Sequence, residues 1–201
     1  TKSAFERNDK DLLSIEKLKR RFSKHIISGD KTLATGLSLL DDCRRFGTLP
    51  FSHLARSAFV AVTLLRSAVI KGIISDDEKD AFLNSIRTVT QMLTDDALSV
   101  SKGKLSWESF IRRYGHLRPG TYDITSPCYS DNPERFLRPI VENIKSHKFN
   151  SSEWTNDSLI RLSNGMKNIG LNYEPSEIDY FLRSSIEGRE YSKFVFTRNW
   201  I

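Results

Sequence analysis

The segment Tyr114–Tyr129 concentrates reactive side chains. It reads YGHLRPGTYDITSPCY and combines an imidazole, a guanidinium, a carboxylate and several hydroxyls with two prolines that stiffen the backbone. His116 can exchange a proton near neutral pH, and Arg118 offers a planar fork of donors to a phosphate or carboxylate. These groups could bind a small polar or phosphorylated ligand. The alternative is that His116, Arg118 and Asp123 only hydrogen-bond the loop to itself, as long loops often require.

Outside this segment the sequence lacks the common catalytic and nucleotide-binding motifs. It contains no G-x-G-x-x-G, P-loop, G-x-S-x-G or H-E-x-x-H pattern. The four histidines have no local metal-ligand spacing, and Cys43 and Cys128 lack Cys or His neighbours at such a spacing. We therefore predict two reduced thiols, no disulfide and no metal site, and we expect His25, His53 and His147 to be structural.

Composition indicates a globular protein with a mild positive charge. The 201 residues, 38% of them hydrophobic, can build the core of one domain, and we expect a single helical domain over residues 1–201. The apolar stretch 58–65 is too short for a membrane span, so no membrane is expected as a partner. The chain begins with Thr1 and not with a methionine, and its first residues lack the charged-then-apolar layout of a signal peptide. We expect a fragment of a longer, cytoplasmic protein.

Apolar spacing and helix-breaking residues predict an all-α fold. A helix of about 16 residues should end near Gly29, a second over 31–45 should stop at Gly47, and a third should run from Pro50 to Gly72. The third is apolar nearly all round, which is typical of a helix in the middle of a domain. The expected multi-helix bundle carries one long functional loop, at about residues 115–132.

Further helices are expected in the second half of the chain. Ser75 and Glu78 form a capping box that should begin one long helix over about 76–101. Ser106 should cap a short helix that ends at Tyr114. Pro139 should divide 133–148 into two short helical pieces. Two more helices are expected over about 157–168 and from Pro175 to the end of the chain.

The loop resembles a signature of phosphoenolpyruvate-synthase-like phosphotransferases. Residues 114–127 follow Tyr-Gly-His-Arg/Leu-x-Pro-Gly-x-x-Asp-Ile/Leu-x-x-Pro, a version of which rifampicin phosphotransferases carry. The strongest similarity is to the branch that includes the glutamine kinases of capsule phosphoramidate biosynthesis. Residues 47–56 and 188–199 also resemble this family. One departure is Cys128, at a position where the resembling sequences commonly have Arg.

The resemblance implies a protein with three parts. An ATP-grasp domain would transfer a phosphoryl group from ATP, with Mg²⁺, to a histidine on a mobile domain, and this phosphohistidine would deliver it to a small-molecule acceptor held by a central helical domain. This chain carries neither the ATP-grasp nor the phosphohistidine motif. We therefore expect the acceptor-binding domain, with L-glutamine as the candidate acceptor, with no cofactor of its own and no activity when isolated. Its expected partners are the acceptor and the other two domains of the same chain.

Roles for single residues follow from this resemblance and from the chemistry of the transfer. His116 or Asp123 would act catalytically by accepting the acceptor's proton, and cations would meet the phosphoryl oxygens. The predicted substrate-binding residues are Arg118, Thr121, Tyr122, Ser126, Arg56, Arg189 and Glu190.

Purely structural roles are the alternative for some of these residues. Arg56 could be a buried or interfacial helix arginine that packs along apolar surface. Glu190 and Lys193, three positions apart, could be only an exposed ion pair.

Two other functions remain as alternatives. The domain could be a non-catalytic helical scaffold that spaces and docks the ATP-grasp and phosphohistidine domains. A module that binds nucleic acid or another partner is supported only by the net charge of +6, because the basic residues are scattered among acids. We therefore expect no nucleic acid as a partner.

Overall fold

The computed structural model describes residues 2–29, 31–119, 123, 125–144 and 154–199. In these ranges the chain forms helices and no strand, which confirms the all-α prediction. The elements are α1 (Lys2–Ser28), α2 (Leu33–Asp42), a π-helical turn (Cys43–Thr48), α3 (Leu49–Ile70), α4 (Asp76–Ser85), α5 (Val89–Ser101), α6 (Trp107–Tyr114), α7 (Pro133–Phe136), α8 (Arg138–Glu142), α9 (Asn156–Lys167) and α10 (Pro175–Asn199).

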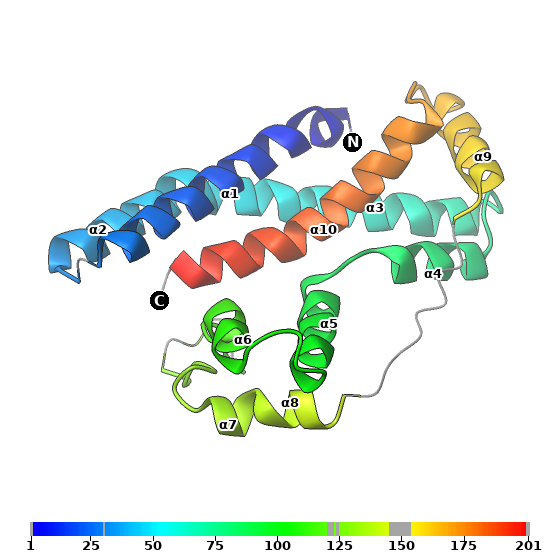
Figure 1. Cartoon of the computed structure of the whole chain (residues 1–201). Coiled ribbons are helices and arrows are strands. Elements are labelled where there is room, and N and C mark those ends of the chain that lie inside the picture. Colours follow the sequence, from blue (N-terminus) through cyan, green and yellow to red (C-terminus); the bar gives the residue numbers. More distant parts are fainter. Residues whose placement is uncertain (1, 30, 120–122, 124, 145–153, 200–201) are drawn as a thin grey trace.

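The helices form a long layer and a smaller group beside it. Helices α1, α3 and α10 pack against one another along the long layer, and α2 extends one end of it (Figure 1). Helices α5 to α8 form the smaller group, which lies below the C-terminal half of α10 in the view of Figure 1. The loop that joins α6 to α7 therefore lies within the smaller group.

Each part has its own cluster of buried apolar side chains. One, which includes Leu65, Phe82 and Leu182, joins α3, α4, α9 and α10. A second, which includes Leu18 and Leu54, lies where α1, the π-turn, α3 and α10 meet. The third fills the small group of α5 to α8 and consists of Ala97, Phe110, Tyr114, Leu137 and Val141. Phe194 of α10 packs against both the second and the third clusters, so α10 connects the two parts.

The predicted helix end at Gly47 is wrong. The backbone continues from α2 through the π-turn into α3, and Gly47 does not take the left-handed conformation that closes a helix. A Cβ atom built on Gly47 would lie 2.6 Å from the ring of Phe196, so the glycine allows α10 to pack closely against the π-turn. This glycine is required by packing between distant segments and not by a local turn.

Two other predicted helices have wrong boundaries. The single helix expected over 76–101 is divided, because Ile86 takes an extended conformation and the Thr88 side chain caps α5 by accepting the amide of Gln91. The first helix is 27 residues long and not about 16. In its first turns Phe5 stacks on Phe181 of α10, and Asn8, only 2% exposed, hydrogen-bonds to Ser184 and Ser185 of the same helix.

Most local signals are confirmed. Gly29, Gly72, Gly103 and Gly170 have positive φ angles at or just after helix ends, where only glycine is unstrained. The Ser75 capping box is complete. The two short pieces after Pro133 and the helices near 157–168 and from Pro175 are present as α7, α8, α9 and α10, while the predicted ends at 145–148 and 200–201 lie outside the described residues. Both cysteines are buried free thiols, and burial raises the pKa of Cys43 to about 11.

The run Leu33–Ile70 is long and apolar enough to cross a membrane, judged by length and composition alone, with an 18-residue window of mean hydropathy 1.3. A core helix of a globular protein can pass the same test. Within this run α3 buries Leu54, Ala58, Ala61 and Leu65 against its neighbours, although only 33% of the window is buried. The expectation that the chain has no membrane span therefore stays a prediction.

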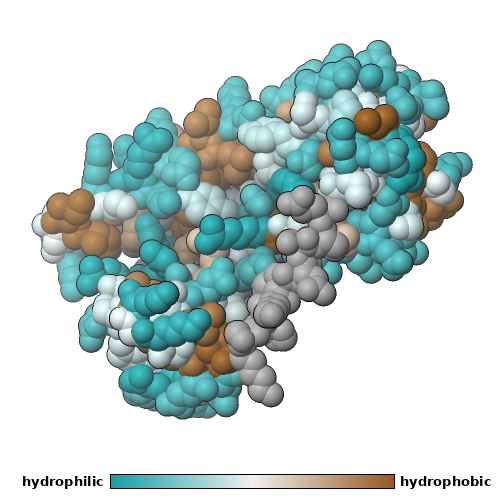
Figure 2. Space-filling view, turned by 45° about the vertical axis from the view of Figure 1, so that its right-hand side comes forward, coloured by the Kyte–Doolittle hydropathy of each residue, from teal (hydrophilic) through white to brown (hydrophobic). Residues whose placement is uncertain are grey.

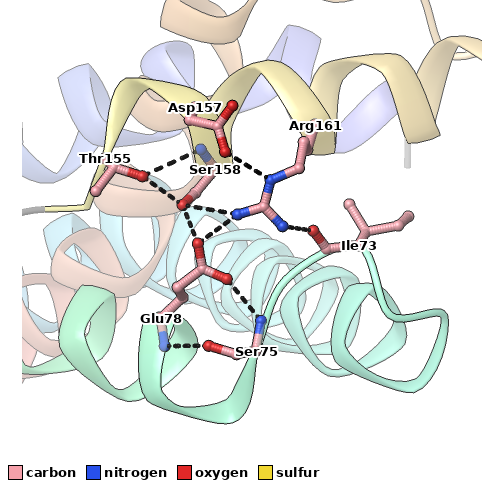
Figure 3. Close-up of polar contacts among 7 residues, drawn as sticks. All are labelled: Ile73, Ser75, Glu78, Thr155, Asp157, Ser158 and Arg161. Atoms are coloured by element: carbon pink, nitrogen blue, oxygen red, sulfur yellow. Dashed lines mark hydrogen bonds and ion pairs between the residues drawn. The ribbon is translucent and has the colours of Figure 1, made fainter.

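A polar network joins the start of α4 to α9 (Figure 3). The Glu78 carboxylate accepts hydrogen bonds from the Ser75 amide at 2.7 Å, from the Ser158 hydroxyl, and from Arg161 Nη2 at 2.5 Å. Arg161 also donates to the Ile73 carbonyl and pairs with Asp157 at 2.9 Å. The capping carboxylate thereby also links two helices that are far apart in the sequence.

This network should make stability depend on pH. The hydrogen bond from Ser158, followed by those from the Ser75 amide and Arg161, lowers the pKa of Glu78 to about 2 from an ordinary 4.5. Because the folded state has the lower pKa, the stabilisation is present above about pH 4.5 and is lost as the pH falls towards 2. We expect a loss of about 1–2 kcal/mol from this group, since solvent screens a partly exposed site.

Denaturant unfolding of wild type and Glu78→Gln from pH 6 to pH 2.5 measures this loss. The two stability curves should converge as the pH falls. Glu108→Gln, at an exposed carboxylate on α6, is the control and should follow the wild type. Parallel curves for wild type and Glu78→Gln would contradict the assignment.

Candidate functional site

The α6–α7 loop is closed at its neck by backbone hydrogen bonds. The Ser130 amide donates to the Gly115 carbonyl at 2.9 Å, and the Tyr129 amide donates to the Leu117 carbonyl at 2.8 Å. Gly115 is needed here, because a Cβ atom on it would lie 2.5 Å from the Ile111 carbonyl oxygen and 2.9 Å from the Ser130 Cβ. The neck therefore fixes the position of residues 116–118.

Tyr114 fastens the start of the loop to the small group of helices. Its side chain is 1% exposed, and its hydroxyl donates to Asp96 of α5 at 2.7 Å. Arg113 pairs with the same carboxylate at 2.5 Å. Burial and the hydrogen bond to Asp96 raise the pKa of Tyr114, so the phenol stays protonated and keeps donating.

Part of the loop is hydrogen-bonded to itself. Asp123 accepts from the Thr125 amide at 2.9 Å, from the Thr125 hydroxyl at 2.6 Å and from the Ser126 hydroxyl at 3.0 Å. These bonds, first that of the Thr125 hydroxyl, lower the pKa of the exposed Asp123 carboxyl. Arg118 Nη1 donates to the Ser126 carbonyl at 2.7 Å. The predicted ligands Thr121 and Tyr122 lie outside the described residues.

His116 is half-buried against α10. Its Nε2 lies 3.2 Å from the Phe194 carbonyl oxygen, which can only accept, so Nε2 carries the proton in the neutral ring. Burial, followed by the positive charge of Arg198, lowers the pKa of His116 to about 4. The imidazole is therefore neutral at pH 7, with an unprotonated Nδ1 that is buried.

A cavity of about 160 Å³ lies between the loop, the start of α5 and α10. We call it the Arg118 cavity. His116 and Arg118 line it from the loop, and Glu190 and Lys193 line it from α10. Its remaining wall consists of Val89, Thr90, Leu117, Phe194 and Thr197. The cavity thus combines two cations, one carboxylate and a neutral imidazole with apolar surface.

The structure brings three of the predicted site residues together, His116, Arg118 and Glu190. Arg189, the neighbour of Glu190, instead places its guanidinium over the ring of Phe59 at 5.1 Å.

The other described candidates do not line the Arg118 cavity. Asp123 and Ser126 are engaged in the loop's own hydrogen bonds. Arg56 is exposed on α3, which differs from the buried position considered for it. The roles assigned to these residues stay predictions.

Lys193, which the sequence suggests as either an ion-pair partner of Glu190 or a ligand-binding residue, and Thr197, for which it predicts no role, also line the cavity. A signal for both was present. Glu190, Lys193 and Thr197 are spaced by three and four residues, which places their side chains on one face of a helix. That face turns toward the loop in the folded chain.

Cys128 does not line the Arg118 cavity. It is 8% exposed, its sulfur lies 3.1 Å from the Ser130 hydroxyl, and it lines a separate cavity together with Arg198. The departure from the arginine of the resembling sequences therefore falls outside the Arg118 cavity. Among the residues that the structure describes, no three His, Cys, Asp or Glu side chains gather as metal ligands.

These features define an all-α domain. In it, a closed loop and the long helix α10 together line a charged cavity. Residues 57–158, half of the chain, match the family described as the rifampicin phosphotransferase fourth domain, and the chain belongs to this family. The matched region contains α4 to α8 and the whole loop. No curated protein and no solved structure matched the chain.

Proposed function

We propose that this domain binds the small-molecule acceptor of a phosphotransferase, and that the Arg118 cavity holds it. The observation that carries the proposal is the meeting of His116 and Arg118 from the loop with Glu190 and Lys193 from α10 in one cavity. Because the chain belongs to a family of phosphotransferase domains, phosphoryl transfer is the reaction that we propose.

The charges of the cavity suit phosphoryl transfer to a zwitterion. Arg118 and Lys193 would face the acceptor's carboxylate and the oxygens of the incoming phosphoryl group, and Glu190 would bind its ammonium. We therefore propose an amino acid as the acceptor, with L-glutamine as the candidate from the sequence resemblance.

His116 is the proposed base. As the acceptor atom bonds to phosphorus and the bond from phosphorus to the carrier histidine of another domain breaks, a proton leaves the acceptor for the His116 ring. Nδ1 is buried in the structure, so the ring must turn to present this atom to the acceptor. A neutral imidazole with a pKa of about 4 is a weak base when the cavity is empty. The arriving phosphoryl group is anionic and would raise this pKa, so basicity would increase only with both partners in place. ATP and Mg²⁺ would act at the ATP-grasp domain.

Calorimetric titration of this chain with L-glutamine tests the proposal. Arg118→Gln and Glu190→Gln should each weaken binding at least about tenfold, because each removes a charge-assisted hydrogen bond of about 1.5–3 kcal/mol. Arg66→Gln, at an exposed arginine on α3, is the matched control and should bind as the wild type does. Equal affinity in all four proteins would contradict the Arg118 cavity as the site.

The hydrogen bonds inside the loop favour one alternative function, a scaffold that only spaces the neighbouring domains. Arg118 and Asp123 both bond to Ser126, as a loop that merely orders itself would require. In that case calorimetric titration with amino acids would show no heat of binding. A full-length protein with His116→Ala and Arg118→Ala would also keep wild-type turnover.

A further inference from the structure

A second cavity, of about 520 Å³, lies between the C-terminal end of α1 and the loop. We call it the Arg198 cavity. Phe22, Ile26 and Ile27 of α1 form one side, and Ile111 of α6 adds to the apolar surface. His116 lines this cavity as well as the Arg118 cavity. The face in Figure 2 is mostly hydrophilic and carries several hydrophobic patches, one of them at the left-hand end, where Figure 1 places the junction of α1 and α2.

The charged side chains that line the Arg198 cavity are all basic. Arg112 and Arg198 line it, and no described acidic residue does. Arg198 Nε is buried and makes no hydrogen bond to the described part of the chain. The guanidinium carbon lies 4.7 Å from the centroid of the Phe22 ring, which holds the cation at the apolar wall. Burial lowers the pKa of Arg198, as expected for a charge that has lost water without gaining a carboxylate.

We propose that the Arg198 cavity binds an amphiphilic anion, a carboxylate or phosphate head group on an aliphatic body. The head group would pair with Arg198, and the aliphatic body would cover Phe22, Ile26 and Ile27. An inorganic anion would leave the apolar walls in contact with water, and a neutral hydrocarbon would bury the arginine without a partner. Only a ligand that combines both properties satisfies both parts of the cavity.

Titration of this chain with four probes tests the site by calorimetry. Octanoate and octyl phosphate carry both features, octanol lacks the charge, and acetate lacks the aliphatic body. We expect octanoate or octyl phosphate to bind at least about tenfold more tightly than octanol and acetate, because each control probe loses one class of contact. The tighter of the two amphiphiles distinguishes a carboxylate head group from a phosphate.

Two variants separate the head-group contact from the tail contact. Arg198→Gln should weaken binding of the amphiphiles about tenfold or more. Ile26→Gln lies at a position that is 63% exposed, so it leaves the core intact and should weaken binding of the tail. Arg66→Gln should bind as the wild type does.

Three results would overturn the proposal. They are equal affinity for octanol and octanoate, unchanged affinity in Arg198→Gln, or no binding by either amphiphile. None of these measurements requires that L-glutamine binds, so failure here and failure of the acceptor site are separate outcomes.

Discussion

Phe110→Ala is expected to lower the free energy of unfolding by about 3–5 kcal/mol, the usual loss for a fully buried phenylalanine. Phe110 is 0% exposed at the centre of the small cluster of α5 to α8. Its ring contacts Tyr114 at a centroid distance of 5.0 Å and Trp107 at 6.0 Å. The cavity left by the truncation would lie beside the residue that anchors the loop, so the loop should lose order first.

Urea unfolding followed by circular dichroism measures this effect. Phe59→Ala is the matched control, because Phe59 is 60% exposed and makes a described contact with the Arg189 guanidinium. Its loss should stay below about 1 kcal/mol, the contribution of an exposed cation–π pair. Similar losses in both variants would mean that the small cluster is not a cooperative core.

Gly115→Ala should destabilise the protein by about 1–3 kcal/mol through overpacking at the neck of the loop. The backbone of Gly115 has φ −61° and ψ −26°, which alanine adopts without strain, so the cost comes from contacts alone. The added methyl group would meet the Ile111 carbonyl oxygen at 2.5 Å, and a backbone oxygen cannot move aside as a side chain can. Ser130 must then move away, and the hydrogen bond that closes the neck is strained.

Gly36→Ala provides the opposite control. Gly36 lies inside α2, and a Cβ atom there would meet nothing within 4 Å. Alanine should stabilise the protein by about 0.5–1 kcal/mol at this position, because glycine loses more backbone entropy in a helix. Thermal unfolding of both variants gives the sign of each change. A stabilised Gly115→Ala protein would show that the neck tolerates a side chain.

Local signals in the sequence predicted helix ends better than helix continuity. Gly72 and Gly103 close helices through their own backbone conformation, which needs no information from elsewhere. Gly47 could not be interpreted in this way, because its role depends on Phe196 of α10. The break at Ile86 has a local cap in Thr88, but the apolar spacing on both sides concealed it.

The candidate site was predictable where one segment carries the chemistry. His116 and Arg118 belong to a single dense loop, and both line the Arg118 cavity. The direction in which a helix face points was not predictable, so Arg56 and Arg189 appeared equal to Glu190 although only Glu190 reaches the cavity. The Arg198 cavity requires α1, the loop and α10 to meet, and no local pattern records such a meeting.

The position of His116 has a thermodynamic consequence. One imidazole forms part of the wall of both cavities, so ligands in the two would share a contact. Linkage then requires reciprocity: if a ligand in one cavity changes the affinity of the other by some factor, the second ligand changes the affinity of the first by the same factor. A single coupling free energy, measured in either order of addition, would describe how the two halves of this domain communicate.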